Sequence, residues 1–292
     1  MVSENGQNRP EDYPFTSLWF EQPDSGYRQH YLDEGKGPPV VMVHGNPTWS
    51  YYYRHLIKAL APERRCIVPD HLGCGYSDKP QDWSYRLADH IQNLRHLLDH
   101  LSIESFDLVV HDWGGPIGLG AALEKTEQIR RVVILNTAAF PSQRIPKRIA
   151  LCRMPGLGEF LIRAFNAFAW PATWMATTRG FSRETKKNYL LPYDSWANRI
   201  AIARFVQDIP LEKNHPSYPS LEWIESQLDI LREKPVRILW GGKDFCFNQL
   251  FFEEWKQWLP GAETTLYGDA GHYVLEDARP GIEESIRSFL TK

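Results

Sequence analysis

Short apolar runs alternate with longer amphipathic segments through the first half of the chain. The runs are rich in Val and Ile, which is typical of strands buried on both faces. We predict four such strands, at residues 39–43, 66–68, 106–110 and 131–135. Apolar residues at helical spacing predict helices between them, at residues 51–60, 87–101 and 115–123.

The same alternation returns near the end of the sequence. Residues 236–240 and 264–267 predict two further strands, and residues 250–258 and 282–290 predict two further helices. Strands that alternate with helices indicate a mostly parallel sheet with helices on both faces. Because crossovers between parallel strands are right-handed, this order predicts a doubly wound α/β fold.

The alternation stops between residues 137 and 231. Apolar spacing there is helical and aromatic residues are frequent, with prolines at Pro155, Pro171, Pro192 and Pro210. An insertion of this length between two strands is typical of a lid. We therefore predict a core made of residues 1–136 and 232–292, and an inserted helical cap made of residues 137–231.

Composition narrows the class of protein. Of the 292 residues, 42% are hydrophobic and 24% are charged, as in ordinary globular domains. Lys and Arg number 33 against 36 Asp and Glu, and this net charge of −3 gives no basic surplus for nucleic acid. The four cysteines lack a C-x-x-C pair, and no apolar stretch approaches the roughly 18 residues of a membrane span. We expect a cytoplasmic protein without disulfides, and no sequence feature specifies its oligomeric state.

A carboxylate stands where a predicted strand turns into a glycine-rich helix. The segment VHDWGG at residues 110–115 places Asp112 at this sharp turn, the position of a nucleophile elbow. A carboxylate is already an anion, so it can displace a leaving group from saturated carbon and form an ester on the enzyme. Water can then cleave that ester. The alternative for Asp112 is a simple cap of the following helix.

His272 and Asp244 follow the last two predicted strands. In an elbow fold the base comes after the nucleophile and the acid along the chain, which selects His272 among ten histidines. His272 would take a proton from the water that attacks the ester. Asp244 is the leading candidate for the carboxylate that orients His272, because the strand after the nucleophile ends in Asn136. The alternative for Asp244 is a turn residue after two glycines.

Two residues offer N–H donors near the predicted nucleophile. Asn46, in the segment HGNP at residues 44–47, follows the first long buried strand, where this kind of fold has its oxyanion-hole loop. The backbone N–H groups of Asn46 and Trp113 would stabilise charge on the ester oxygen. Their side chains would bind a halide-sized anion in an apolar pocket, which an aromatic content of 13% favours. The alternative for Asn46 is a turn residue before proline.

Five segments together resemble the haloalkane dehalogenases of the α/β-hydrolase superfamily, over nearly the whole chain. They are HGNPTWSYYYR at 44–54, PDHLGCGYSDKP at 69–80, VVHDWGG at 109–115, WGGKDF at 240–245 and GHYVLED at 271–277. In that family a carboxylate displaces halide, and the ester is hydrolysed to an alcohol with the help of a histidine.

The resemblance implies a role for each matching position. It makes Asp112 the nucleophile, His272 the base, Asp244 the acid, and Asn46 with Trp113 the halide-binding pair. An acid after the later strand, combined with an Asn halide ligand, is similar to the third subfamily of that family. No cofactor or metal is implied, because the nucleophile carries its own charge.

The chain also resembles the β-lactone decarboxylases of long-chain olefin biosynthesis. The segments that carry this resemblance are NTAAFP at 136–141, PGLGEFLIRAFNAFAW at 155–170, LPYDSWANR at 191–199, FVQDIPL at 205–211 and KDFCFN at 243–248. The same nucleophile would open a strained lactone instead of expelling a halide. The sequence places haloalkane dehalogenation slightly ahead of lactone decarboxylation, with a small apolar molecule as substrate in both cases and halide as a product of the first.

Two further alternatives are open. Epoxide hydrolases share the HDWG elbow and use two lid tyrosines, for which Tyr189 or Tyr193 could serve, but they carry an aromatic residue where this chain has Asn46. Trp113 disfavours fluoroacetate dehalogenases, which have Arg after the nucleophile. A non-catalytic ligand-binding protein of the same fold is the alternative outside enzymes, and the intact set of Asp112, His272 and Asp244 argues against it.

Overall fold

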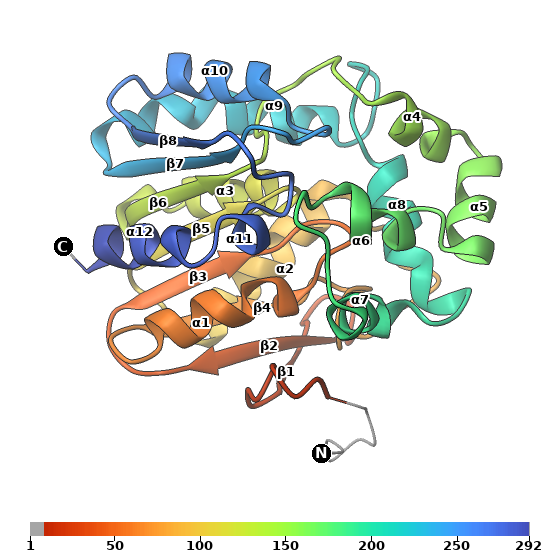
Figure 1. Ribbon diagram of the computed structural model, residues 1–292, viewed down its shortest axis with the longest axis horizontal. Coiled ribbons are helices and arrows are strands. Elements are labelled where there is room, and N and C mark those ends of the chain that lie inside the picture. Colours follow the sequence, from red (N-terminus) through yellow and green to blue (C-terminus); the bar gives the residue numbers. More distant parts are fainter. Residues whose placement is uncertain (1–8, 292) are drawn as a thin grey trace.

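The computed structural model describes residues 9–291, which form an eight-stranded sheet with helices on both faces (Figure 1). The strand order is β1-β2-β4-β3-β5-β6-β7-β8, with β1 and β2 antiparallel to their neighbours and the other pairs parallel. The strands are β1 (Leu18–Glu21), β2 (Arg28–Glu34), β3 (Pro39–Val43), β4 (Arg65–Pro69), β5 (Phe106–His111), β6 (Ile129–Leu135), β7 (Val236–Gly241) and β8 (Glu263–Tyr267). The predicted doubly wound α/β architecture is confirmed.

Helices fill the connections between the strands. The α-helices of the first half are α1 (Arg54–Leu60), α2 (Leu87–His100) and α3 (Gly114–Leu123). Those that follow β6 are α4 (Lys147–Arg153), α5 (Leu157–Phe165), α6 (Ala169–Met175), α7 (Arg183–Leu190), α8 (Ile200–Gln207) and α9 (Tyr218–Gln227). The last are α10 (Gln249–Trp258), α11 (Val274–Asp277) and α12 (Gly281–Leu290). Short 3₁₀ helices are η1 (Ser50–Tyr53), η2 (Thr126–Gln128), η3 (Leu191–Tyr193), η4 (Ala197–Arg199) and η5 (Leu228–Glu233).

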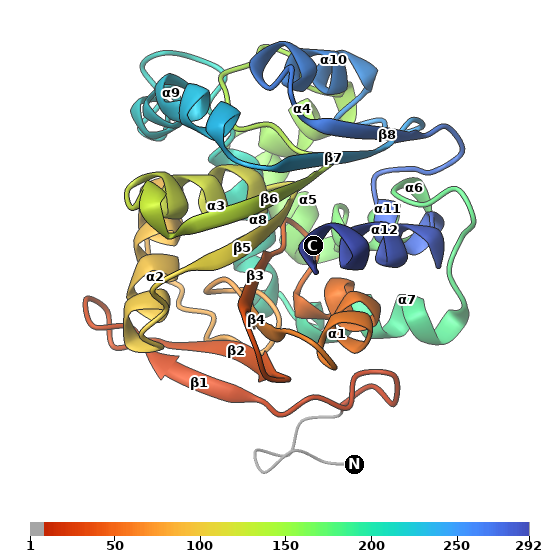
Figure 2. The same cartoon turned by 90° about the vertical axis from the view of Figure 1, so that its left-hand side faces the viewer.

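Alternate residues of each central strand face opposite layers of the core. In β5, Leu108 and Val110 pack with α2 and α3, whereas Val109 packs on the other side, with α1 and α12. Figure 2 shows these two helix pairs on opposite sides of the strands. A parallel central strand is buried on both faces, so its sequence is a continuous run of apolar residues. These runs allowed the central strands to be predicted.

Strands β1 and β2 were not predicted. Strand β2 has the sequence RQHYLDE, in which polar side chains mask the alternation, although Gln29 and His30 are buried. These residues are buried because each finds a polar partner: Gln29 accepts from Gln22, and His30 contacts Asp70. Polar side-chain pairs allow these residues to be buried, so β2 lacks the hydrophobic pattern from which a strand can be predicted.

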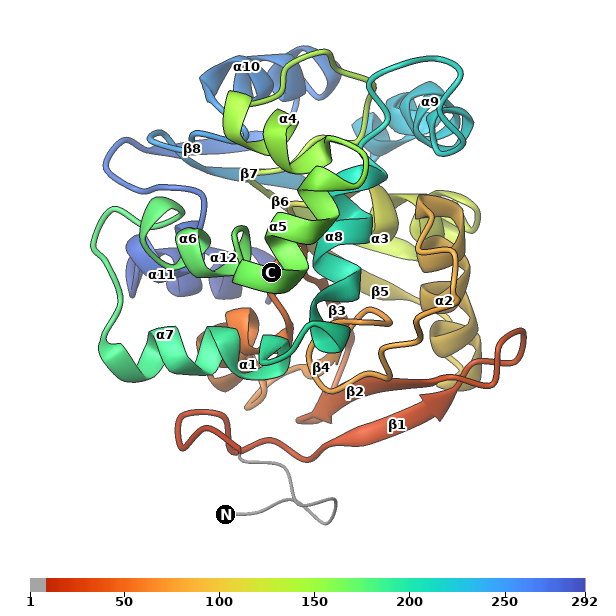
Figure 3. The ribbon, with the colours of Figure 1, turned by 90° about the vertical axis from the view of Figure 1, so that its right-hand side faces the viewer.

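The helices between β6 and β7 cover the edge where the parallel strands end. Figure 3 looks onto this side of the molecule, with α4, α5, α7 and α8 in front of the sheet. Helix α9 lies beside α3, and its Leu221 and Ile224 pack into the same core layer as α3. The domain boundaries at 137 and 231 stay a prediction. In the described part of the chain, no helix is long and apolar enough to cross a membrane.

Candidate active site

Asp112 lies at the bend between β5 and α3, in a backbone conformation that side chains rarely adopt. Its φ is +53°, in the left-handed region. The bend is possible because the surrounding residues lack side chains. A Cβ on Gly45 would lie 2.1 Å from Oδ1 of Asp112, and one on Gly115 would lie 1.9 Å from Oγ1 of Thr137. The sequence expectation of a strained elbow among small residues agrees with this geometry.

The carboxylate of Asp112 is buried and held by two backbone N–H groups. The N–H of Asn46 donates to Oδ1 over 2.6 Å, and the N–H of Trp113 donates a second hydrogen bond. Burial raises the pKa of Asp112, while the facing His272 and these N–H donors act in the opposite direction. The side chain therefore points into the protein toward the two predicted oxyanion-hole donors, and it does not cap α3.

His272 lies between two carboxylates. Its Nδ1 is 2.8 Å from Oδ2 of Asp244, and its Nε2 is 3.6 Å from Oδ2 of Asp112. Burial opposes the charged imidazolium, but the Asp244 carboxylate outweighs it, with help from Asp112, and raises the pKa of His272. When His272 is neutral, Asp244 accepts the Nδ1 proton, so the Nε2 lone pair faces Asp112. The structure thus brings together the three residues of the predicted triad.

Asn136 is a residue of the site for which the sequence analysis assigned no role. It follows β6, and its Nδ2 donates to Oδ2 of Asp244 over 2.8 Å. The other carboxylate oxygen, Oδ1, accepts from the N–H of Cys246 over 2.6 Å. Asn136 has a φ of +30° and also bonds the backbone of Gly241 through both ends of its amide. The sequence signal that could have identified Asn136 as a site residue was its position at the end of the strand next to the elbow, because functional polar side chains gather at that edge of the sheet.

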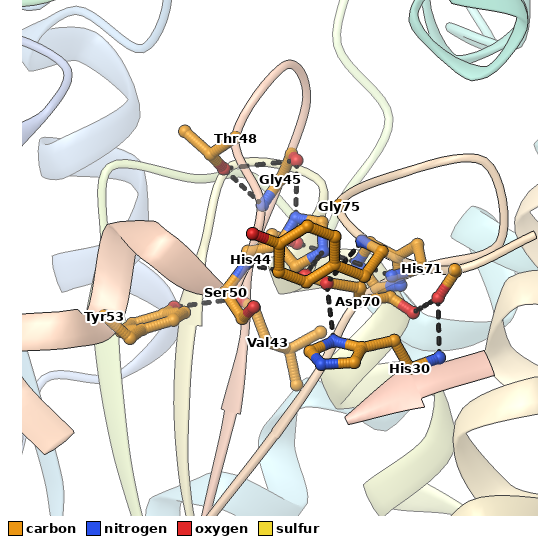
Figure 4. A network of polar contacts seen from close by, with 12 residues as sticks. His30, Val43, His44, Gly45, Thr48, Ser50, Tyr53, Asp70, His71 and Gly75 are labelled. Atoms are coloured by element: carbon orange, nitrogen blue, oxygen red, sulfur yellow. Dashed lines mark hydrogen bonds and ion pairs between the residues drawn. The ribbon is translucent and has the colours of Figure 1, made fainter. Parts of the chain in front are cut away.

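A buried polar network supports the loop that carries Asn46 (Figure 4). Asp70 accepts hydrogen bonds from Nδ1 of His30 over 2.7 Å and from the N–H of Ser50 over 2.7 Å. His44 accepts from the N–H of His71 through Nε2, so its Nδ1 proton donates to the carbonyl of Gly45. Burial lowers the pKa of His44 and of His71, which keeps both rings neutral. These histidines therefore position the loop by hydrogen bonding.

A cavity of about 350 Å³ opens above these groups. Asp112, Trp113, Asn46 and His272 are among its lining residues, and most of the remaining wall is apolar. Trp113 lines the cavity, and its indole N–H has no protein acceptor within the described residues, which leaves this donor available to a ligand. Asn46 donates its amide to the carbonyl of Ile202 over 3.3 Å, and its Oδ1 has no partner in the described part of the chain.

The two lid tyrosines named for an epoxide hydrolase do not line this cavity. The hydroxyl of Tyr189 donates to Glu276 over 2.5 Å, and that of Tyr193 donates to the carbonyl of Thr48 over 3.2 Å. Each hydroxyl is thus committed to a protein acceptor away from Asp112. The epoxide hydrolase alternative loses the two acids that its mechanism needs.

Comparison with known proteins gives the family. The family model described as alpha/beta hydrolase fold matches residues 38–278, and the chain belongs to this family. It is 45% identical over 275 residues to a cis-3-alkyl-4-alkyloxetan-2-one decarboxylase of Shewanella oneidensis, covering 92% of this chain and 86% of that protein. It is 30% identical over 293 residues to haloalkane dehalogenase 2 of Mycobacterium tuberculosis, covering 95% and 96%.

Solved structures agree with the second of these resemblances. The crystal structure of a haloalkane dehalogenase from Bradyrhizobium elkani superposes with a TM-score of 0.85 at 26% identity, covering 94% of this chain and 98% of that one. The predicted α/β-hydrolase fold is therefore confirmed. Of the two activities that the sequence analysis weighed, the alternative, decarboxylation, belongs to the more similar relative, which reverses the order given there.

Proposed function

We propose that this protein is a decarboxylase of β-lactones (oxetan-2-ones) that carry alkyl groups on C3 and C4, with Asp112 as its nucleophile. Identity of 45% to a relative of that name, against 30% to a dehalogenase, is the observation that carries the choice. The geometry supports it, because the carboxylate proposed as nucleophile lines a largely apolar cavity. Asp244 and Asn46 keep the roles toward His272 and the ester oxygen that the sequence analysis gave them, as parts of this proposal. His272 acts here as a cation instead of a base, and Trp113 binds a carboxylate instead of a halide.

The first step opens the ring. Oδ2 of Asp112 attacks C4 of the lactone, the bond between C4 and the ring oxygen breaks, and its electron pair makes the released group a carboxylate. Asp112 becomes an alkyl ester whose carbonyl oxygen is Oδ1, the atom that accepts from Asn46. The indole N–H of Trp113 is placed to donate to the new carboxylate, as it would to a halide.

The second step releases the alkene. The bond between C3 and the carboxylate carbon breaks, its electron pair forms the double bond, and the bond between C4 and Asp112 breaks. Carbon dioxide leaves and the Asp112 carboxylate returns, without water. Protonated His272 stabilises that departing carboxylate across the 3.6 Å gap. Inversion at C4 followed by anti elimination converts a cis lactone into a cis alkene.

Haloalkane dehalogenation is the second candidate, and the free Trp113 donor beside Asn46 favours it. Here the alkyl group of the ester carries no carboxylate that could leave as carbon dioxide. Neutral His272 therefore takes a proton from water, which attacks the carbonyl carbon of the ester, Cγ of Asp112. The products are an alcohol, a halide ion and a proton. For either reaction we place the protein in the cytoplasm, in keeping with four free cysteines among the described residues.

A competition between two substrate classes tests the proposal. Alkene and CO2 formation from a cis-3,4-dialkyl β-lactone is measured beside halide release from a panel of 1-haloalkanes, with Asp112→Asn as the control protein. We expect kcat/KM for the lactone to exceed that for each haloalkane by at least tenfold. Halide release that equals or outpaces alkene formation would overturn the assignment in favour of dehalogenation.

A further inference from the structure

The outer surface of the cap helices exposes an unusual number of large apolar side chains. Six of them are between 42% and 67% exposed: Leu157, Phe160, Phe165, Trp170, Trp174 and Trp196. We call them the cap apolar patch. Phe160 contacts the rings of Phe165 and Trp196, and Trp170 contacts Trp174, so five of the six side chains form two ring clusters. Scattered apolar side chains are normal on a surface, but a cluster of this kind marks an interaction site.

The same part of the chain is strongly basic. Residues 142–187 contain nine Lys and Arg and two acidic residues, a net charge of +7 in a chain whose total is −3. Lys147, Arg148, Arg183 and Lys187 are exposed, and within residues 9–291 none of the four forms an ion pair. We call them the cap basic residues. Of the two acids, Glu159 is bound by Arg163 over 2.7 Å and also lies near Arg204.

The cavity reaches the surface on this face. Arg148 and Leu151 of α4 both line the cavity, and both are exposed to solvent. Pro171 and Met175 of α6 line it as well, on the helix that carries Trp170 and Trp174. The route from Asp112 to the exterior therefore emerges beside the cap apolar patch. Figure 3 views the molecule from this side.

We propose that this face of the cap binds the surface of an anionic lipid bilayer. Tryptophan and phenylalanine side chains favour the headgroup region, and basic side chains are attracted to anionic lipids. The combination of aromatic and basic residues on one face is characteristic of contact in the plane of the interface. An apolar molecule dissolved in the bilayer would then face the cavity mouth.

Charge distinguishes this occupant from a second copy of the chain. A symmetric dimer across the cap would bring two segments of +7 together, and like charges oppose such an interface. A bilayer that contains anionic lipid satisfies the basic residues and the exposed rings at the same time. The inference goes beyond the proposed reaction and holds for any apolar substrate.

Vesicle flotation tests the inference with the full-length protein. Binding to phosphatidylcholine vesicles is compared with binding to vesicles that also contain phosphatidylglycerol. We expect binding that requires phosphatidylglycerol and weakens at least tenfold in high salt. The variants Lys147→Glu/Arg148→Glu and Trp170→Ser/Trp174→Ser should each lower the affinity at least tenfold.

Matched controls make the same kinds of change, basic to Glu and apolar to Ser, outside the cap apolar patch and the cap basic residues. Lys36→Glu/Lys234→Glu alters two basic residues that precede parallel strands, at the opposite edge of the sheet. Trp223→Ser/Leu266→Ser removes two exposed apolar side chains on α9 and β8. Both controls should bind as the wild type does, and circular dichroism verifies that every variant is folded.

Three results would each overturn the inference. They are an absence of phosphatidylglycerol-dependent binding by the folded wild type, equal binding by cap and control variants, and self-association that the cap variants abolish without vesicle binding. Quenching of Trp fluorescence by brominated lipid adds a readout of ring insertion that does not depend on flotation. None of these measurements uses turnover, so a negative result leaves the proposed reaction in place.

Discussion

Asn136 donates a hydrogen bond to Oδ2 of Asp244, the same oxygen that contacts Nδ1 of His272, and both distances are 2.8 Å. The amide fixes the carboxylate from one side while the imidazole approaches from the other. Because Oδ1 of Asp244 is held by the N–H of Cys246, the carboxylate has little freedom to rotate away from His272. Asn136 therefore orients the Asp244 carboxylate that contacts His272, the proposed base.

Asn136→Asp should move the pH dependence of the site. A second carboxylate beside Asp244 stabilises the imidazolium, which raises the pKa of His272 further. We expect a loss of roughly tenfold in hydrolysis of the Asp112 ester at neutral pH, recovered in part at higher pH. Asn198→Asp, on the cap surface, serves as the control. An unchanged pH profile for Asn136→Asp would show that Asn136 has only a structural role.

Protonation of His272 should decide between two fates of the lactone-derived ester. The pKa of His272 lies above its ordinary value, so the ring is protonated below that raised value and cannot take a proton from water. Decarboxylation needs no base and continues there. We expect alkene to dominate at lower pH and the hydroxy acid to gain share as pH rises. Product ratios across a pH series check this, and a ratio independent of pH would contradict it.

Asp112→Asn should abolish turnover of both substrate classes, by at least about a thousandfold, because the amide is not a nucleophile. Burial raises the pKa of Asp112, which means that folding favours its neutral form. A neutral side chain at this position should therefore leave Tm unchanged or higher at neutral pH. Thermal unfolding measured beside activity separates the two effects, and substantial residual turnover would refute nucleophilic attack by Asp112.

His272→Ala should trap the covalent ester formed from a 1-haloalkane. Attack by Asp112 still proceeds, but no base remains to activate water. We expect a mass increase equal to the transferred alkyl group on the peptide that contains Asp112. The double variant Asp112→Asn/His272→Ala should show no such increase. An adduct on another peptide would assign the nucleophile elsewhere.

Labelled water distinguishes the two reactions within one enzyme. In hydrolysis, water attacks the carbonyl carbon of the ester, Cγ of Asp112, and its oxygen stays in the regenerated carboxylate. Single turnover of a haloalkane in H2¹⁸O should therefore place the label in Asp112. Elimination from the lactone-derived ester breaks the bond between carbon and Asp112 oxygen and uses no water. Mass spectrometry of the same peptide after alkene formation should find Asp112 unlabelled. Label there would mean that the ester is hydrolysed.

The sheet and the triad could be predicted because the signals for them are local. Each central strand is an apolar run, and Asp112 and Asp244 each follow one such run at the edge where parallel strands end. His272 follows the exposed edge strand β8, at the same edge of the sheet. Spatial proximity follows from that topology without knowledge of any contact. The roles proposed for Asp112 and Asn46 were assigned from their places after a strand.

Other features depend on contacts that no local pattern reveals. Strand β2 is stabilised by polar pairs across the sheet, such as that of His30 with Asp70, and its sequence alternation is obscured. Asn136 was considered only as a missing carboxylate, because its amide acts through a residue 108 positions away. The distant pairs that keep Tyr189 and Tyr193 out of the cavity are invisible in the sequence for the same reason.

The mostly apolar wall around Asp112 has a bearing on how products depart. Hydrolysis of a haloalkane leaves an anion and a proton behind, and both must cross a region of low polarity before the next cycle. Elimination from a lactone exports two uncharged molecules, one a gas and the other a hydrocarbon. An apolar exit therefore slows the departure of the halide ion and the proton, and it does not hinder carbon dioxide or the alkene.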